Sequence, residues 1–178
     1  MPNVARPIAV FHEHPDWFRP LFTELERRGI PYVRLDAAAH RFDPSEREAP
    51  YSLVVNRASP SAYLRAHGQT TFFTLHWLRH LERLGIPVVN GSAVYGLEIS
   101  KATQLDLLTD LGLPFPRAVV INDASQAPAA AEGLRFPVLV KANVGGSGAG
   151  ITRYDTTETL AGEVAAGRVT LGVDGTAL

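Results

Sequence analysis

The stretch Phe136-Pro-Val-Leu-Val-Lys-Ala-Asn-Val-Gly-Gly-Ser-Gly-Ala-Gly-Ile-Thr-Arg-Tyr154 consists of two short apolar runs on either side of a glycine-rich segment. The runs 136–141 and 151–154 have the composition of strands. Glycine fills four of the six positions 145–150, and each ordered glycine costs roughly 0.5–1 kcal/mol relative to alanine. We therefore predict a strand–loop–strand unit whose backbone N–H groups close around a phosphate without interference from side chains.

This segment differs from the two best-known nucleotide-binding loops. The P-loop and the dinucleotide-binding fingerprint both open a helix, and the P-loop ends in Gly-Lys-Ser or Gly-Lys-Thr. Here Ile151-Thr-Arg-Tyr154 follows, and it is typical of a strand. A flexible hairpin tip is the alternative interpretation of the glycines.

Lysines stand at two positions where an anion would stabilise them. Alternation along the first strand places Lys141 at its end, on the face of Leu139, and a lysine at the end of a buried strand favours a nearby anion. Lys101 falls in the first turn of the helix expected at 101–111, after Ser100 as N-cap, where the helix dipole disfavours a cation. A bound phosphate would resolve both conflicts, and two solvated side chains are the alternative.

Outward from this segment, the first half of the chain alternates short apolar runs with amphipathic segments. Strands separated by helices of this length predict a parallel sheet with helices on its faces. The expected elements are strands at 7–11, 32–35, 51–55 and 86–89 and helices at 15–28 and 73–84.

One junction recurs at the helix ends. Gly29, Gly85 and Gly112 each precede an apolar residue and a proline, and Gly133 begins a looser copy. Glycine takes the left-handed conformation that ends a helix, the apolar residue packs back on the last turn, and proline prevents the helix from resuming. We therefore expect a helix to end just before each of these glycines.

The second half is organised differently. The boundary lies near Asn90-Gly91, so that residues 1–91 form one domain and residues 92–178 another. Exposed loops are expected at 36–50 and 58–69. The expected elements of the second half are strands at 117–121, 136–141 and 151–154 and helices at 101–111, 124–132 and 157–166.

Composition limits the function classes. The 178 residues carry 17 Lys and Arg against 18 Asp and Glu, a formal net charge of -1, which gives no electrostatic footprint for nucleic acid. Cysteine is absent, which excludes a disulfide scaffold and a cysteine-ligated zinc or iron–sulfur site. No run approaches the ~18 consecutive apolar residues of a membrane span. A reducing cytoplasm is the expected location.

Polar side chains follow two of the expected strands, at the sheet edge where α/β proteins bind ligands. Arg57 follows the third strand and is a candidate substrate contact, with a surface arginine as the alternative. His12-Glu13-His14 ends the first strand, and loop histidines are preferred there over a substrate contact.

Two histidines and two tryptophans carry weaker signals. His76 and His80 share a helix face, but no third metal ligand is evident, so a packed or surface pair is the preferred interpretation. Trp17 and Trp77 are expected in the core.

A series of motifs resembles the ATP-grasp superfamily, closest in pattern to its RimK-like amino-acid ligases. The resemblance covers nearly the whole chain. It implies an α/β fold class in which 1–91 is a parallel, Rossmann-like pre-ATP-grasp domain and 92–178 is an α+β first ATP-grasp subdomain, with the second ATP-grasp subdomain missing. Ser100 departs from the family pattern, which often has Asp there, and leaves the contacts around Lys101 open. The motifs are Asn90-Gly91, Ser100-Lys101, Leu111-Gly-Leu-Pro-Phe-Pro116 and the segment 136–150.

The implied reaction is ATP-dependent carboxylate–amine ligation. A carboxylate is phosphorylated, and an amine attacks the acyl phosphate to form an amide. Such chemistry needs cationic clamps and Mg2+ more than a side-chain nucleophile. The implied partners are therefore ATP, an amino-acid or peptide/protein carboxylate, and an amine. By resemblance, Arg57 would contact substrate, Lys101 and Lys141 would contact ATP phosphates, and a loop would fold over the triphosphate: Gly145, Gly146, Ser147, Gly148, Ala149 and Gly150.

No residue of the chain is assigned as catalytic or as a metal ligand. The family's Mg2+ ligands and adenine hinge are expected downstream of Leu178, and Asp174 lies in a turn signal. We therefore expect an incomplete portion of a ligase with little or no catalysis on its own. The alternatives are another ATP-grasp activity of the D-alanine ligase or carboxylase type, a non-catalytic nucleotide-binding module, and a plain Rossmann-like binder with an incidental loop. A homo-oligomer is compatible with the sequence, which does not set the oligomeric state.

Overall fold

The computed structural model describes residues 6–14 and 16–178, which form two compact units. Unit 1 extends to Gly96 and unit 2 runs from Leu97 to Leu178, so the division lies a few residues beyond the Asn90-Gly91 junction. None of the helices in the described ranges combines the length and apolarity that a membrane span requires.

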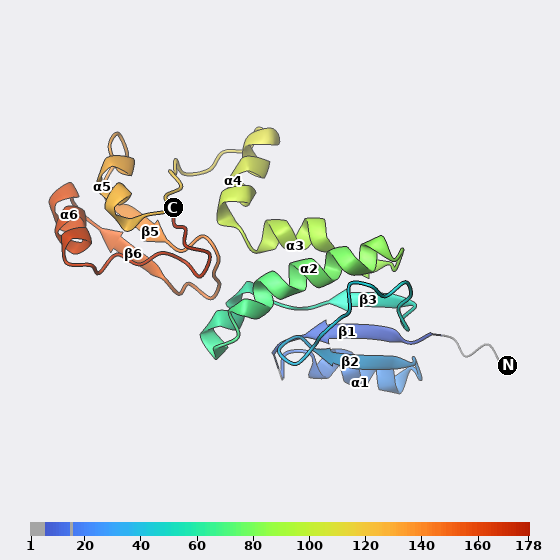
Figure 1. The fold of residues 1–178 in the computed structure, drawn as a ribbon. Helices are drawn as coiled ribbons and strands as arrows, with labels where there is room; N and C mark the ends of the chain where they lie inside the picture. The colour runs from blue at the N-terminus through green and yellow to red at the C-terminus, as the bar shows by residue number, and fades with distance from the viewer. Residues whose placement is uncertain (1–5, 15) are drawn as a thin grey trace. The chain divides into compact units, whose positions relative to one another are not determined.

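Unit 1 contains a four-stranded parallel sheet in the order β2-β1-β3-β4, which confirms the expected parallel α/β architecture. Helices α1 and α2 lie on opposite sides of this sheet (Figure 1). The strands are β1 Ile8–His12, β2 Tyr32–Asp36, β3 Leu53–Asn56 and β4 Val88–Val89, and the helices are α1 Arg19–Arg27, the 3-10 helix η1 Pro60–Arg65, α2 Gln69–Arg83 and α3 Ser92–Glu98.

The core of unit 1 is built on both faces of the central strand β1. Val10 packs with Phe22 of α1 on one face, and Phe11 lies 4.3 Å, ring centroid to ring centroid, from Trp77 of α2 on the other. Trp77 is 2% exposed, as expected for a core residue. The matching prediction for Trp17 is wrong, because that side chain is 53% exposed.

Two further predictions for unit 1 need correction. Helix α1 begins at Arg19 rather than at residue 15, which lies outside the described residues. The segment 58–69 is not an exposed loop, since it contains η1 and the start of α2. The apolar side of η1 buries Pro60 and Ala62, which accounts for the order of this segment.

The glycine junctions adopt the expected conformation. Gly29, Gly85 and Gly112 have φ of 64°, 74° and 64°. After each glycine, the N–H of the next residue donates to a carbonyl in the last turn of the helix, as in Ile30 N–H to the Leu25 oxygen at 3.0 Å. This is the Schellman arrangement, and it explains why α1, α2 and α4 end where the sequence predicts.

Unit 2 contains an antiparallel strand pair that packs against two short helices. Val138 and Val140 of β5 face the core formed around Leu160 of α6 and Ile121. The elements are α4 Lys101–Asp110, the 3-10 helix η2 Ala124–Gln126, α5 Ala127–Ala130, β5 Val138–Lys141, β6 Ile151–Tyr154 and α6 Thr157–Ala165.

The strand expected at 117–121 is absent from unit 2. Within this segment only Ile121 forms a β-bridge, to Ala177. Val119 and Val120 are exposed and pair with no other strand. The helix expected at 124–132 is shorter than predicted and begins as the 3-10 helix η2. Pro128 lies in the first turn of α5, where its missing N–H is tolerated.

We expect Gly85→Ala to lower the free energy of unfolding by about 1 kcal/mol, because alanine pays a penalty at a positive φ. A Cβ at Gly85 would meet no atom within 4 Å, so the backbone conformation alone causes the loss. Gly96 also has open space but lies in α3 without a positive φ, so Gly96→Ala is the matched control and should not destabilise. Chemical denaturation of both variants measures the difference, and equal midpoints would contradict the capping role.

Candidate functional site

The two lysines predicted to bind phosphate lie together in unit 2. Lys101 is the first residue of α4, and Lys141 is the last residue of β5. The two side chains are close enough for the charge of Lys141 to lower the pKa of Lys101. They are also the two lysines of the chain, and all the others among its 17 Lys and Arg residues are arginines. The fold thus gathers both of its lysines at one place.

Asn143 links the start of α4 to the root of the glycine loop. Its side-chain oxygen accepts hydrogen bonds from the N–H of Ala102 at 2.9 Å and from the hydroxyl of Ser100 at 3.3 Å. Its backbone oxygen accepts from the Lys101 ammonium at 3.0 Å. Asn143 is 8% exposed, so its polar atoms depend on these partners. A single buried amide therefore fixes where Lys101 stands relative to the loop.

Asp174 completes this network from the C-terminal segment. Its carboxylate accepts a hydrogen bond from the Asn143 amide at 2.8 Å and another from the Thr176 hydroxyl at 2.5 Å. Leu178 exchanges backbone hydrogen bonds with Lys141 at 2.8 and 2.9 Å, which holds this segment beside β5. The sequence analysis treated Asp174 only as a turn residue, and no local pattern marks its pairing with a residue 31 positions away.

The surroundings of Lys101 lower the pKa of its ammonium group. Burial lowers the pKa of the Lys101 ammonium, the charge of Lys141 lowers it further, and Asp174 offsets part of the shift. Two ammonium groups that repel each other in a partly buried place favour an anion between or beside them. Ser100 caps the helix as predicted, with its hydroxyl accepting from the Thr103 N–H at 3.2 Å.

The glycine loop joins β5 to β6, as expected for a strand–loop–strand unit. Ser147, Gly148 and Gly150 have positive φ, of 57°, 70° and 68°. Around Gly148 the space is open, whereas a Cβ on Gly150 would lie 3.4 Å from the Ala142 side chain. Ser147 and Gly148 are exposed, while Gly145, Gly146 and Ala149 are half-buried. The tip of the loop is therefore free to contact a ligand.

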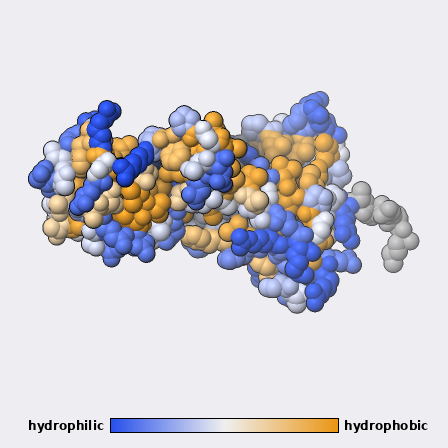
Figure 2. Space-filling model, turned by 90° about the horizontal axis from the view of Figure 1, so that it is seen from above, coloured by the Kyte–Doolittle hydropathy of each residue, from blue (hydrophilic) through white to orange (hydrophobic). Residues whose placement is uncertain are grey.

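An apolar groove of about 630 Å3 includes Lys141 in its wall. Its size falls in the range of small-molecule sites. Hydrophobic surface is also exposed on the part of the chain that forms unit 2 (orange at the left of Figure 2). Besides Lys141, the groove is lined by residues that include Leu105, Val119, Ile121, Ala130 and Val140.

Arg57, the predicted substrate contact, lies in unit 1, at the carboxyl end of β3. Its guanidinium stands 5.1 Å from the ring centroid of Phe18, and its N–H donates to the Phe11 oxygen at 2.7 Å. Arg57 therefore belongs to a different part of the chain from the lysines and the glycine loop.

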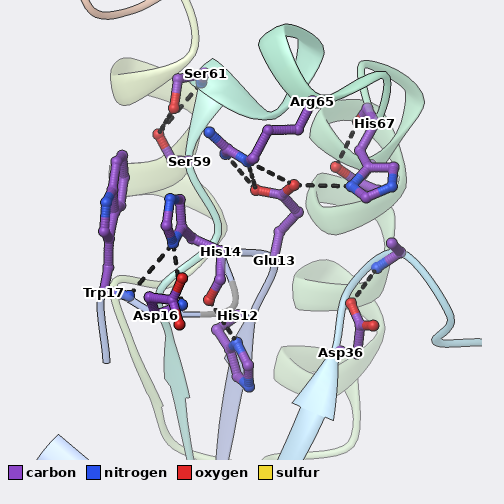
Figure 3. A network of polar contacts seen from close by, with 12 residues as sticks. His12, Glu13, His14, Asp16, Trp17, Asp36, Ser59, Ser61, Arg65 and His67 are labelled. Carbon is purple, nitrogen blue, oxygen red and sulfur yellow. Dashed lines mark hydrogen bonds and ion pairs between the residues drawn. The ribbon is translucent and has the colours of Figure 1, made fainter. Parts of the chain in front are cut away.

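Unit 1 has a polar network of its own at the same sheet edge (Figure 3). The carboxylate of Glu13 accepts hydrogen bonds from the Arg65 guanidinium, including Nε at 2.9 Å, and from Nδ1 of His67 at 2.8 Å. Burial alone would raise the pKa of Glu13, but the hydrogen bonds and charges of Arg65 and His67 outweigh it and lower that pKa. No local pattern around Glu13 predicts its burial.

The two histidines of α2 differ in their surroundings. His76 is exposed and His80 is buried, with Nδ1 of His80 near the Arg83 guanidinium at 3.2 Å. Across residues 6–14 and 16–178, no group of three or more His, Cys, Asp or Glu side chains is arranged to hold a metal ion.

The chain was compared with known proteins by sequence and by structure. No family model matches the chain. A D-alanine–D-alanine ligase of Neisseria meningitidis serogroup C is 30% identical in an alignment 150 residues long, which covers 73% of this chain and 45% of that protein. The RimK domain ATP-grasp protein of Sphaerobacter thermophilus superposes with a TM-score of 0.70 at 19% identity, over 96% of this chain and 61% of that one.

The ATP-grasp ligase PsnB, solved with a minimal precursor, Mg and ADP, superposes with a TM-score of 0.53 at 22% identity, over 95% of this chain and 61% of that one. The chain therefore has the fold of the corresponding part of these ATP-grasp structures. It spans about three fifths of the length of these solved structures and less than half of the D-alanine–D-alanine ligase.

We expect Asn143→Ala to lower the free energy of unfolding of unit 2 by about 2 kcal/mol, because it removes the acceptor of the Ala102 N–H and one of the donors to the Asp174 carboxylate. Asn122→Ala is the matched control, since Asn122 is exposed and, within the described part of the chain, its backbone N–H is its hydrogen-bonding donor. Denaturant unfolding followed by circular dichroism measures both, and equal stability of the two variants would contradict the linking role of Asn143.

Proposed function

We propose that unit 2 binds the triphosphate of ATP and that the protein is an ATP-dependent carboxylate–amine ligase of the RimK-like type. The observation that carries this proposal is the convergence of Lys101 and Lys141 beside the glycine loop. Two like charges held close together repel each other in the empty site, and both attract a bound polyanion. Triphosphate supplies the charge and the length that two ammonium groups and a loop of backbone N–H groups would match.

The remaining parts of unit 2 support a nucleotide. Loop residues 145–150 can turn their N–H groups toward phosphate oxygens, since the exposed loop tip has open space around it. The apolar groove that includes Lys141 is large enough for a planar base. In this arrangement Lys101 and Lys141 bind phosphate oxygens, and Gly145, Gly146, Ser147, Gly148, Ala149 and Gly150 cover them.

Magnesium has no evident ligands in unit 1 or unit 2 among the described residues. The described residues contain no group of acidic side chains that would hold an ion, so Mg2+ would enter with the nucleotide phosphates. When bound, Mg2+ disperses the negative charge that develops on the transferred phosphoryl group. The residues of this chain contribute binding and orientation of the phosphates.

The proposed reaction has two steps. The carboxylate oxygen attacks the γ-phosphorus of ATP, the bond to the β-phosphate oxygen breaks, and ADP leaves. The amine then attacks the acyl carbon, loses a proton, and releases phosphate as the amide forms. Cationic side chains stabilise the charge that builds up in the first step. Arg57 of unit 1 is a proposed substrate contact.

A D-alanine ligase type of activity is the second candidate. It is favoured by the 30% identity to the Neisseria meningitidis enzyme. The RimK-like type is favoured by the order of sequence motifs and by the superposition on the RimK domain protein. Both candidates use the same lysines and differ in the substrates that the whole protein accepts.

We expect Lys141→Ala to weaken the binding of ADP with Mg2+ by at least about tenfold, because one charged contact to phosphate is lost. Arg168→Ala is the matched control, since Arg168 is an exposed basic side chain of the same unit that pairs with Glu163. Isothermal titration calorimetry measures both affinities. Equal affinity of the Lys141 variant and the wild type would refute the phosphate role.

We also expect the affinity for ADP to fall as the pH rises through the pKa of Lys101, which lies below the ordinary value of 10.5. Phosphate binds the charged ammonium, so the affinity is full below that pKa and is lost above it. Lys101→Arg keeps a positive charge at alkaline pH and should retain affinity there. An identical alkaline loss in the wild type and in Lys101→Arg would show that Lys101 does not contact the nucleotide.

A further inference from the structure

A segment without a helix connects β2 to β3 in unit 1. Both strands run parallel to β1 and lie on opposite sides of it, so the connection has to cross β1. Such a crossover is usually made by an α-helix. Here residues 37–52 contain only turns and irregular backbone, and we call them the crossover segment. Because no helix stabilises it, the crossover segment depends on a few side chains for its position.

His40 is the side chain by which the crossover segment reaches the core of unit 1. Its imidazole makes T-shaped contacts with three aromatic rings, at centroid distances of 5.5 Å to Phe11, 4.6 Å to Trp77 and 6.2 Å to Phe73. Phe11 belongs to β1, and the other two rings belong to α2. His40 therefore fills a place between the sheet and α2 that an apolar side chain would normally occupy.

The place of His40 suits a neutral ring better than a charged one. Nε2 of His40 is buried and has no hydrogen-bond partner within residues 6–14 and 16–178. Burial lowers the pKa of the imidazole, and no charge of the described residues offsets that effect. An imidazolium ion placed there would give up its hydration without gaining an acceptor for its Nε2 proton. Protonation should therefore favour a conformation in which the ring is in water.

Backbone contacts fix the chain on either side of this ring. Before it, the N–H of Ala37 donates to the His12 oxygen at 2.8 Å. After it, the Arg83 guanidinium donates to the backbone oxygen of Pro44 at 3.3 Å. Neither contact involves the imidazole. We call the residues between these two points, 38–43, the flap, since both of its ends are held without the help of the ring.

The charged groups near the flap gather around His80 rather than around His40. Nδ1 of His80 lies 3.2 Å from the Arg83 guanidinium, and its Nε2 lies 4.0 Å from the Glu46 carboxylate. On β1, the ring of His12 faces α1, on the other side of the sheet. The other charged or titratable side chains of the flap and of α2 are exposed: Arg41, Asp43, His76, Arg79 and Glu82.

We propose that His40 is a pH-sensitive switch: the neutral ring docks the flap on β1 and α2, and the flap leaves this position when the ring binds a proton. The proton comes from water, and the imidazolium regains its hydration outside the core. Release uncovers the indole of Trp77 and the ring of Phe11. The switch is independent of the ATP site, because all of its residues lie in unit 1.

The direction of the pH dependence follows from the two states of His40. In the released flap the ring has its ordinary pKa of 6.5, and burial makes the pKa lower in the docked flap. Docking is therefore fully favourable above that ordinary value, and it is lost as the pH falls through the pKa of the docked ring. Acidification releases the flap, and neutral or alkaline pH restores the docked position.

The fluorescence of Trp77 measures the release in the full chain. Trp17 is the other tryptophan and is 53% exposed, so a Trp17→Phe parent leaves Trp77 as the reporter. Trp77 is 2% exposed, so acrylamide should quench it little while the flap is docked. We expect a several-fold, reversible rise in quenching between about pH 8 and about pH 5, the range in which imidazole titrates. Quenching that stays constant over this range would overturn the proposal.

Two histidine variants of the parent assign the transition to a residue. His40→Leu puts an apolar side chain that does not titrate in the same place, so Trp77 should stay protected down to about pH 5. His76→Gln changes an exposed histidine of α2 and is the matched control, which should respond as the parent does. A transition that persists in His40→Leu would overturn the proposal, since it would then belong to another group.

NMR spectroscopy of the parent decides the matter even if His40→Leu folds poorly. The His40 ring should show nuclear Overhauser effects to the rings of Trp77 and Phe11 at about pH 8, where imidazole is neutral. We expect these effects to vanish as His40 binds a proton, while the amide signals of β1 and α2 stay dispersed. Effects that persist in the protonated form would overturn the proposal. A loss of dispersion throughout unit 1 would also overturn it, because the whole unit would then unfold together.

Discussion

The hydrogen bonds of Asn143 are the constraint on which the ATP site depends. One buried amide accepts donors from the first turn of α4 and donates to Asp174, while its backbone oxygen accepts from the Lys101 ammonium. A glycine-rich loop has little stiffness of its own, because its residues lose the most conformational freedom on folding. Anchoring its first residues to a helix start and to the C-terminal segment confines that freedom to the loop tip. The position of Lys101 then follows from the fold rather than from a flexible side chain.

The charges around Lys101 favour the binding of an anion. Burial and the charge of Lys141 act against the ammonium of Lys101, and Asp174 compensates only in part. Repulsion and partial burial disfavour the two ammonium groups in the empty site, and a bound polyanion offsets both effects. That the chain has arginine elsewhere and lysine only at these two positions fits a need for compact, strongly hydrated point charges rather than planar forks. In unit 1, by contrast, the buried carboxylate of Glu13 pairs with an arginine, Arg65, through two nitrogens of its planar guanidinium.

Local signals in the sequence were sufficient for much of the fold. Gly29, Gly85 and Gly112 mark helix ends because a positive φ is a property of single residues, and Ser100 marks a helix start for a similar reason. Segment 117–121 looked like a strand, but a strand needs a ladder partner, and only Ile121 found one. The contact of Asn143 with Asp174 and the burial of Glu13 were not predictable, since both depend on residues far apart in the chain. Trp17 was misplaced because large aromatic residues usually enter the core, whereas contacts with His14 and Arg65 hold it at the surface.

The most direct test of the ATP site uses the fact that the chain has two lysines. Lysine-selective 13C labelling gives one set of side-chain NMR signals for Lys101 and one for Lys141, which the variant Lys101→Arg assigns. We expect both sets to shift when a non-hydrolysable ATP analogue and Mg2+ are added, and we expect the pKa of Lys101 to rise in the complex, because phosphate stabilises the ammonium. Signals that stay unchanged at saturating analogue, with the pKa of Lys101 as low as in the free protein, would contradict the assignment of these lysines to the triphosphate.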